Sequence, residues 1–357
     1  MDAFTGTRPV ATEHAFDVAV LESYLRERLP SFSGPLEVEQ FKGGQSNPTY
    51  LLHTPAARYV MRAKPGPRAR LLASAHAIER EYRVMRALAG TAVPVAATHL
   101  LCEDESVIGR AFYVMDFVEG RVFWDQALPG LAGAQRRQIY DEMSRVIAAL
   151  HAVDPAEVGL GDYGRAGNYF ERQIGRWSKQ YRASELEPIA AMDRLIEWLP
   201  RSLPASARDA SQLTLVHGDF RLDNMIFHPT QPRVLAVLDW ELSTLGHPLA
   251  DFSYNCMAWH IPHTTGRGLA GLDIAGLGLP SEHDYVRSYC ERTGRDAGAF
   301  AADWNFYLAY NLFRLAAISQ GVAHRAAAGV AASAQAREAG ALARPLAELG
   351  WSYATRP

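Results

Sequence analysis

The run His217–Asn224 (HGDFRLDN), followed by Val237–Glu241 (VLDWE), decides which fold the sequence predicts. Within it, Asp219 and Asn224 lie five positions apart, and Asp239 comes twenty positions after Asp219 (224 − 219 = 5; 239 − 219 = 20). A carboxylate can accept a proton, and an amide and a second carboxylate supply the hard oxygen donors that Mg²⁺ prefers. The two segments therefore predict a site with one general base and two metal ligands.

The same five-residue offset separates the catalytic Asp from the metal-binding Asn in the protein-kinase pattern H-R-D-L-x-x-x-N, which D-F-G follows. On this basis we predict that Asp219 is the base and that Asn224 and Asp239 hold Mg²⁺. His217 is expected to orient the loop, hydrogen-bonded near Asp239. Glu241 is either a further carboxylate near the metal or an ordinary solvated side chain. The alternative for Asp219 is a turn residue, which Asp often is.

Composition excludes several classes of protein. The chain has 357 residues, of which 48% are hydrophobic, and a formal net charge of −3. That charge argues against a nucleic-acid-binding protein, and the length is typical of two lobes. The three cysteines are far apart and form no CxxC pair, which favours a reducing cytoplasm. Neither a signal peptide nor a membrane span is expected, because no segment is continuously apolar for long enough.

The periodicity predicts an α+β, bilobal chain. After an amphipathic helix over Glu13–Leu29, five short β-rich runs are interrupted by one helix over Ser74–Leu88, and this order suits an antiparallel five-stranded sheet with an inserted helix. The five runs are LEVEQF, PTYLLHT, RYVMRA, ATHLLCE and RAFYVMDFV. Beyond them, long helical patterns predominate, which predicts an N-lobe over 1–117 and a helical C-lobe over 118–357. Pro345 should end or kink the last helix.

A glycine pair lies between the first two predicted strands, in FKGGQSNPTY. Gly43 and Gly44 would let the backbone approach phosphates, and Ser46 or Asn47 could donate hydrogen bonds to them. A common Gly-Gly hairpin is the alternative. The segment is not a GxxxxGK[ST] loop, which disfavours a P-loop enzyme.

The strand RYVMRAKP offers two cations that could hold the α- and β-phosphates of a nucleotide. Arg62 directly follows the apolar triplet, and Lys64 projects from the same face two residues later. We favour Arg62, paired with Glu81 on the next helix, with Glu79 as the second choice of partner. Ordinary surface charge is the alternative for all four residues.

Together these segments resemble the aminoglycoside phosphotransferase-like family, and within it the kinase-like domain fused to some acyl-CoA dehydrogenases and its stand-alone bacterial relatives. The resemblance runs from about Gly43 to Tyr254. Its segments are GGQSNPTY, YVMRAKP, REYRVMRAL, YVMDFVEG, DYGRAGNYFERQIGRWSKQY, LVHGDFRLDN and VLDWELSTLGHPLADFSY. It implies a bilobal kinase fold and Mg²⁺- and ATP-dependent phosphorylation of a small-molecule hydroxyl. On a kinase fold, the backbone of Asp116, Phe117 and Val118 would pair with adenine. Many family members have Lys where this chain has Arg62.

The fused relatives suggest a hydroxyacyl-CoA or hydroxy acid as acceptor. Antibiotics (aminoglycosides or macrolides) and choline-type alcohols are alternatives. From another class, a nucleotide-binding pseudokinase module is kept as an alternative, whereas a metallophosphatase lacks its D-x-H and G-N-H-[DE] ligands. Candidates for the wall of the acceptor site, or else core residues, are Tyr169, Arg172, Trp177, Tyr181 and Trp259. We expect a monomer or homodimer.

Overall fold

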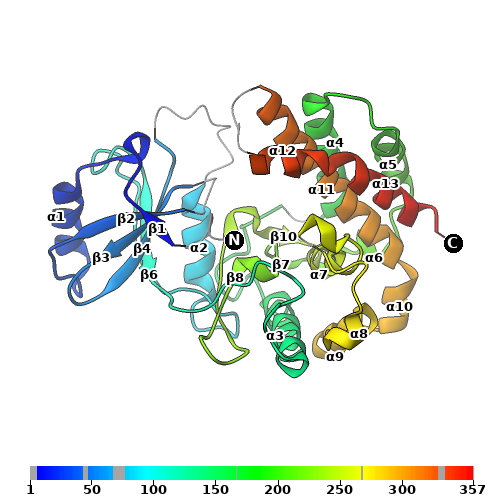
Figure 1. The fold of residues 1–357 in the computed structure, drawn as a ribbon, viewed down its shortest axis with the longest axis horizontal. Coiled ribbons are helices and arrows are strands. Elements are labelled where there is room, and N and C mark those ends of the chain that lie inside the picture. Colours follow the sequence, from blue (N-terminus) through cyan, green and yellow to red (C-terminus); the bar gives the residue numbers. More distant parts are fainter. Residues whose placement is uncertain are drawn as a thin grey trace. The chain divides into compact units, whose positions relative to one another are not determined.

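A computed structural model describes residues 6–42, 47–66, 77–165, 167–266, 268–328 and 334–356. The chain forms two compact units, each of which Figure 1 shows as a ribbon. The first unit comprises Met1–Trp124 and Leu222–Ser243, and the second comprises Asp125–Arg221 and Thr244–Pro357. The division drawn from the sequence, 1–117 and 118–357, differs in the boundary and in the segment 222–243, which was assigned to the helical part.

The first unit is built on an antiparallel sheet in which the strand order is β1-β2-β3-β4-β6-β5. The strands are β1 (Thr7–Arg8), β2 (Glu37–Phe41), β3 (Thr49–His53), β4 (Arg58–Ala63), β5 (Thr98–Cys102) and β6 (Phe112–Asp116). Strands β2 to β6 are the five that the sequence predicts, and the α+β class is confirmed. The sixth strand, β1, pairs with β2 and has only two residues, too few to show a period of two.

The two α-helices described in this unit are α1 (Val18–Arg28) and α2 (Ile78–Leu88). Helix α1 begins after Asp17, whose carboxylate accepts hydrogen bonds from two amides of the first turn at 2.9 and 3.2 Å. Leu21 and Leu25 of α1 are fully buried in the same core as Tyr50 and Phe112 of the sheet. Each fully buried leucine side chain stabilises the fold by about 1.5–3 kcal/mol.

A hairpin from later in the chain completes the first unit. Strand β8 (Met225–Phe227) pairs with β9 (Val234–Val237), and the 3₁₀ helices η3 (Leu222–Asn224) and η4 (Trp240–Leu242) flank it. The backbone of Phe227 exchanges two hydrogen bonds of 2.8 Å with Arg121. Gly120 makes this approach feasible, because a Cβ atom there would lie 2.2 Å from the carbonyl oxygen of Phe227.

The second unit is mainly helical. Its longer elements are α3 (Gly133–His151), α4 (Tyr169–Ser184), α5 (Ala190–Arg201), α7 (Pro248–Cys256), α9 (Glu282–Thr293), α11 (Trp304–Ala327), α12 (Ala334–Ala341) and α13 (Ala343–Ala354). The short ones are α6 (Ala205–Arg208), α8 (Ile274–Leu277), α10 (Ala297–Ala302), strands β7 (Thr214–Val216) and β10 (Thr244–Gly246), and further 3₁₀ turns. Pro345 lies in the first turn of α13 and neither ends nor kinks it, because the amide that proline lacks is not needed there.

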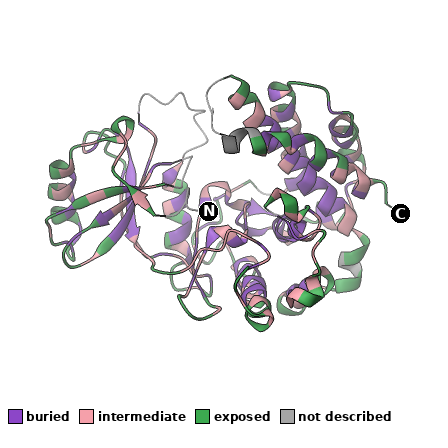
Figure 2. Ribbon diagram, in the orientation of Figure 1, coloured by how far each residue is buried: buried purple, intermediate pink, exposed green. Residues whose placement is uncertain are grey.

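Helix α11 is the core element of this unit. It packs against α4, α5, α7 and α13, and most of its central residues are buried, as Figure 2 shows. At one contact Gly350 of α13 lies so close to α11 that an added Cβ atom would be 3.2 Å from Leu312. The buried residues of α11 are mostly apolar, as is typical of a core helix, but they include the polar side chains of Asn311, Arg314, Ser319 and Gln320.

The segment His217–Asn224 follows β7, which pairs with β10 in antiparallel register. His217–Arg221 belongs to the second unit, and Leu222–Asn224 belongs to the first. In the part of the chain that the structure describes, no helix is both long and apolar enough to span a bilayer.

Candidate active site

A network of charged side chains surrounds Arg62 in the first unit. Its Nε lies 3.1 Å from Oε2 of Glu81 on α2, and its Nη2 lies 3.0 Å from Oδ1 of Asp239 and 3.6 Å from Oε2 of Glu241. Glu81 also accepts hydrogen bonds from Asn47 Nδ2 at 3.0 Å and from the Tyr113 hydroxyl at 3.2 Å. The predicted contact between Arg62 and Glu81 is therefore present.

The electrostatics of this network favour a permanent cation. The side chains of Arg62 and Glu81 are only 12% and 2% exposed. Burial lowers the pKa of Arg62, but the carboxylates of Glu81, Asp239 and Glu241 outweigh burial and raise that pKa above its ordinary value. A guanidinium held by several carboxylates has a fixed direction, which is what the binding of a phosphate requires.

Lys64 belongs to a different pair. Its Nζ forms an ion pair with Glu79, and both side chains are about one-third exposed. The two cations that the sequence left open thus have different partners. Arg62 contacts Asp239, whereas Lys64 contacts the residue that the sequence offered as the second choice for the helix partner.

The hairpin β8–β9 brings Asn224 and Asp239 together. Asn224 immediately precedes β8, and its carbonyl oxygen accepts a 2.8 Å hydrogen bond from the amide of Leu238, the neighbour of Asp239. Asp239 has a left-handed backbone with φ of 63°, a conformation rare for residues other than glycine and typical of constrained sites. Its side chain is 35% exposed.

This donor set fits Mg²⁺. An amide oxygen and a carboxylate are hard ligands, and Mg²⁺ usually keeps several waters and takes one or two carboxylates together with substrate phosphates. Among the described residues there is no group of three or more His, Cys, Asp or Glu side chains arranged for a metal. The sparse pair of Asn224 and Asp239 is thus the arrangement expected for a cation that a nucleotide helps to hold.

The predicted phosphate loop is only partly described. Gly43, Gly44 and Ser46 lie outside the described residues. Asn47 is fully buried, and its Nδ2 donates to Glu81. A polar side chain this deep needs an internal partner, and the carboxylate of α2 provides one. The role of Asn47 at the phosphates stays a prediction.

In the segment 116–118, which is predicted to face adenine, two backbone amides already donate hydrogen bonds within the protein. The N–H of Asp116 donates to Ala97 at 2.9 Å, and that of Phe117 donates to Arg58 at 3.4 Å. Within the described chain, Val118 is the one residue of the three whose amide has no acceptor. If this segment contacts adenine through an N–H group, Val118 is the donor.

The predicted base, Asp219, belongs to the second unit. Arg221 contacts both of its oxygens, with Nε 3.0 Å from Oδ1 and Nη2 3.3 Å from Oδ2. Burial raises the pKa of Asp219, but the charge of Arg221 and a hydrogen bond from Tyr254, helped by His217 and Arg314, bring the pKa below its usual value. Asp219 is therefore ionised at neutral pH and can accept a proton.

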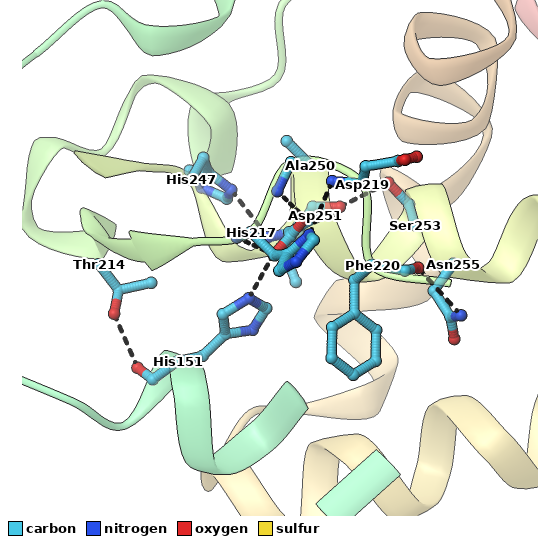
Figure 3. A network of polar contacts seen from close by, with 12 residues as sticks. His151, Thr214, His217, Asp219, Phe220, His247, Ala250, Asp251, Ser253 and Asn255 are labelled. Atoms are coloured by element: carbon cyan, nitrogen blue, oxygen red, sulfur yellow. Dashed lines mark hydrogen bonds and ion pairs between the residues drawn. The ribbon is translucent and has the colours of Figure 1, made fainter. Parts of the chain in front are cut away.

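Asp251 on α7 holds the backbone of the loop that carries Asp219. Its carboxylate accepts the amides of His217 at 2.7 Å and Gly218 at 2.8 Å, and His151 Nε2 lies 3.4 Å away (Figure 3). His217 is fully buried, and its Nδ1 accepts the amide of Asp219 at 3.2 Å. In Figure 3 the carboxylate of Asp219 points away from these groups, so the network fixes the loop and leaves the base facing elsewhere.

No role for Asp251, Arg221 or Arg314 was predicted from the sequence. A signal for Asp251 existed, because a single acid within the apolar helix PLADFSY is costly to bury without donors. The backbone amide of His217 donates to Asp251, and the hydrogen bond near Asp239 that the sequence predicts for His217 stays a prediction.

Replacing Asp251 by Asn tests the support of the loop. We expect a loss of about 2–4 kcal/mol in the free energy of unfolding, because the NH₂ group of Asn replaces one carboxylate oxygen and cannot accept, so one of the two buried N–H groups loses its acceptor. Urea titration measures the loss. Asp141→Asn, which removes an exposed pair with Arg292, is the matched control with about 1 kcal/mol or less.

The effect of Asp251→Asn should also depend on pH. Burial raises the pKa of Asp251, but His151 and the amide of His217 lower it below the ordinary value. The ionised carboxylate therefore stabilises the fold at neutral pH, and this stabilisation is lost as the pH falls through the lowered pKa. Equal unfolding free energies for Asp251→Asn and the wild type at neutral pH would contradict the assignment.

The candidates for the acceptor wall divide into two groups. Tyr169, Trp177 and Tyr181 on α4 are buried in the second unit, and Arg172 donates to the carbonyl of Arg165 at 2.8 Å. Trp259 instead donates to the carbonyl of Pro280 and packs on Tyr140 and Tyr285. Trp259 is half-buried, and its contacts are with other residues of the second unit.

Comparison with known proteins places these features in a family. The model of the phosphotransferase enzyme family matches residues 37–289. In Mus musculus, acyl-CoA dehydrogenase family member 10 is 47% identical over 353 residues, 98% of this chain and 32% of that protein. Acyl-CoA dehydrogenase family member 11 of Mus musculus is 41% identical over 360 residues, 99% of this chain and 45% of that protein. The chain thus spans less than half of these curated relatives.

Two solved structures of aminoglycoside phosphotransferases are similar to this chain. A candidate aminoglycoside phosphotransferase from Ralstonia eutropha JMP134 has 60% identity and a TM-score of 0.87, with 95% of this chain and 98% of that chain covered. A thermostable mutant of aminoglycoside phosphotransferase APH(4)-Ia, in complex with ADP and hygromycin B, has 16% identity and a TM-score of 0.61, covering 94% and 99%. The second likeness shows the shared fold alone.

Proposed function

The chain belongs to the phosphotransferase enzyme family, and from this premise we propose that it transfers the γ-phosphoryl group of ATP to a hydroxyl of a small molecule, with Mg²⁺ as cofactor. The observation that carries the proposal is the contact of Arg62 with both Glu81 and Asp239. In this contact Arg62, the cation expected at the phosphates, forms an ion pair with Asp239, the carboxylate expected at the metal.

In the proposed reaction, the acceptor oxygen forms a bond to the γ-phosphorus, the bond from that phosphorus to the β-phosphate oxygen breaks, and ADP leaves. Asp219 accepts the hydroxyl proton. Arg62 orients the α- and β-phosphates. Asn224 and Asp239 hold Mg²⁺, which neutralises charge on the phosphates when bound.

Arg221 has to release Asp219 for this chemistry. As long as its guanidinium occupies both carboxylate oxygens, no oxygen is well placed to receive the proton. A phosphoryl group is a stronger attraction for a guanidinium than one carboxylate, because it carries more charge. We therefore propose that the γ-phosphate draws Arg221 from Asp219 and so frees the base.

We propose a hydroxyacyl-CoA or hydroxy acid as acceptor. The curated relatives are named acyl-CoA dehydrogenases, which supports an acyl compound. The charges that lower the pKa of Asp219 in the second unit are positive, those of Arg221, His217 and Arg314, and they disfavour cationic acceptors. An aminoglycoside or choline would require acidic groups there. The fold neighbour bound to hygromycin B and a microcompartment-associated aminopropanol kinase keep those alternatives in the test.

The three cysteines are buried and form no disulfide, which supports a reducing cytoplasm as the site of action. The alternative of another class, a pseudokinase, predicts nucleotide binding without transfer. Retention of an ionised Asp219 held by a dedicated network argues against it, because a module without chemistry needs no base.

The proposal is tested by offering ATP and Mg²⁺ with hydroxyacyl-CoAs, hydroxy acids, choline, homoserine, macrolides and aminoglycosides. We expect ADP and a new phosphate monoester in equal amounts with one of the first two classes, measured by coupled assay and ³¹P spectra. ATP binding without turnover on any of these acceptors would favour the pseudokinase.

Removal of metal gives a further prediction. Excess EDTA should abolish transfer, and added Mg²⁺ should restore it, because Asn224 and Asp239 cannot neutralise phosphate charge by themselves. Initial rates of ADP formation before and after the addition measure this. Turnover that persists in EDTA would contradict the roles of both residues.

A further inference from the structure

Arg314 is a buried cation without an acidic partner. It lies near the middle of α11, and its residue is 5% exposed. Within the described chain, no carboxylate lies at ion-pair distance from its guanidinium. A buried charge is normally paired, because its removal from water costs several kcal/mol. Its presence in the core of the second unit therefore calls for an explanation.

Arg314 contacts the loop that carries Asp219 through one hydrogen bond and two aromatic rings through cation–π contacts. Its Nη2 donates to the carbonyl oxygen of Gly218. Its guanidinium lies 4.9 Å from the ring centre of Tyr254 and 5.5 Å from that of Trp177. Cation–π contacts of this kind hold a guanidinium in place and partly replace its hydration.

Asp219 is the carboxylate that contributes to the raised pKa of Arg314. The groups that raise its pKa against burial are three phenols, those of Tyr310, Tyr254 and Tyr169, and the carboxylate of Asp219. Tyr254 is itself hydrogen-bonded to Asp219. Since the phenols are neutral, the single negative charge in this group is the proposed base.

We propose that Arg314 is a positioning residue that acts through its positive charge, holding the Gly218 carbonyl and so keeping Asp219 in place when Arg221 turns to the phosphate. This inference rests on the proposed function, because it presupposes that Asp219 is the base. It explains why an arginine, and not an apolar residue, occupies the core position. No sequence motif predicts this role of Arg314, because 95 residues separate it from Asp219 (314 − 219 = 95).

The test uses Arg314→Ala and two planar solutes. Guanidinium and urea have the same shape and both donate N–H groups, but only guanidinium is charged. We expect Arg314→Ala to lower kcat about 100-fold, the effect typical of a misplaced catalytic group. Millimolar guanidinium should raise the kcat of Arg314→Ala at least about tenfold, and urea at the same concentration should leave it unchanged. Equal rescue by both would overturn the proposal in favour of simple packing.

Two side-chain replacements keep the test decisive if Arg314→Ala does not fold. Arg314→Lys preserves the charge and Arg314→Gln removes it, so kcat should be at least about tenfold higher for Lys. Equal kcat values would overturn the proposal. Arg325→Ala, an exposed position on α11, is the matched control and should respond to neither solute. Absence of transfer by the wild type would instead refute the proposed function, a distinct result.

Discussion

Replacing Asp219 by Asn should lower kcat for phosphoryl transfer by about 10²–10⁴-fold, the range typical of the loss of a general base. Asn keeps the size of the side chain and one oxygen for Arg221, so the loop should keep its shape. It cannot accept the proton of the acceptor hydroxyl. ATP affinity should change little, because Asp219 belongs to a different unit from the predicted phosphate and metal ligands.

The measurement is a rate of ADP formation with the best acceptor, together with ATP titration by calorimetry. Asp141→Asn, an exposed aspartate of the same unit, should leave both unchanged. Full turnover by Asp219→Asn would exclude Asp219 as the base. Loss of ATP binding together with turnover would indicate instead that the substitution disturbs the fold.

Replacing Arg62 by Met should cost about 3–5 kcal/mol in the free energy of unfolding, because removal of one member of a buried ion pair leaves an uncompensated charge. Glu81 is almost completely buried and would lose its one cationic partner among the described residues. Asp239 and Glu241 would lose the same cation. The substitution should also weaken ATP binding, since the proposed contact with the phosphates is removed.

Lys64→Met is the matched control for Arg62→Met, two residues away on the same strand face. Its pair with Glu79 is about one-third exposed, so the loss should be about 1 kcal/mol or less. Urea titration gives the stability of both variants, and calorimetry gives their ATP affinity. A greater loss of affinity in Lys64→Met than in Arg62→Met would assign the phosphate contact to Lys64.

Much of the first unit could be predicted because its signals are local. Strands β2 to β6 are short, rich in β-forming residues and separated by Gly, Asn or Pro, although β4 and β6 are buried almost continuously rather than alternately. The helix partner of Arg62 follows from the register of β4 and the face of α2. The side-chain partner of Asn47 could not be predicted. Its place near a glycine pair suggested phosphate, whereas the fold turns it toward Glu81.

Contacts across long separations account for what the sequence did not reveal. Asp251 and Arg314 contact the loop of Asp219 from α7 and α11. Asp251 lies in a segment that carries the family resemblance but was given no role there, and Arg314 lies outside those segments. The sequence also did not predict that residues 222–243 belong to the first unit, because the amino-acid composition does not change at Arg221 or Ser243.

The most direct test of the central claim is whether Asp239 couples ATP binding to Mg²⁺. Calorimetric titration of the wild type should show markedly tighter ATP binding with Mg²⁺ than with EDTA, because the cation joins the phosphates to Asn224 and Asp239. Asp104→Asn, an exposed aspartate of the same unit, should behave like the wild type. The account predicts that Asp239→Asn loses this gain from Mg²⁺, and an undiminished gain in Asp239→Asn would contradict it.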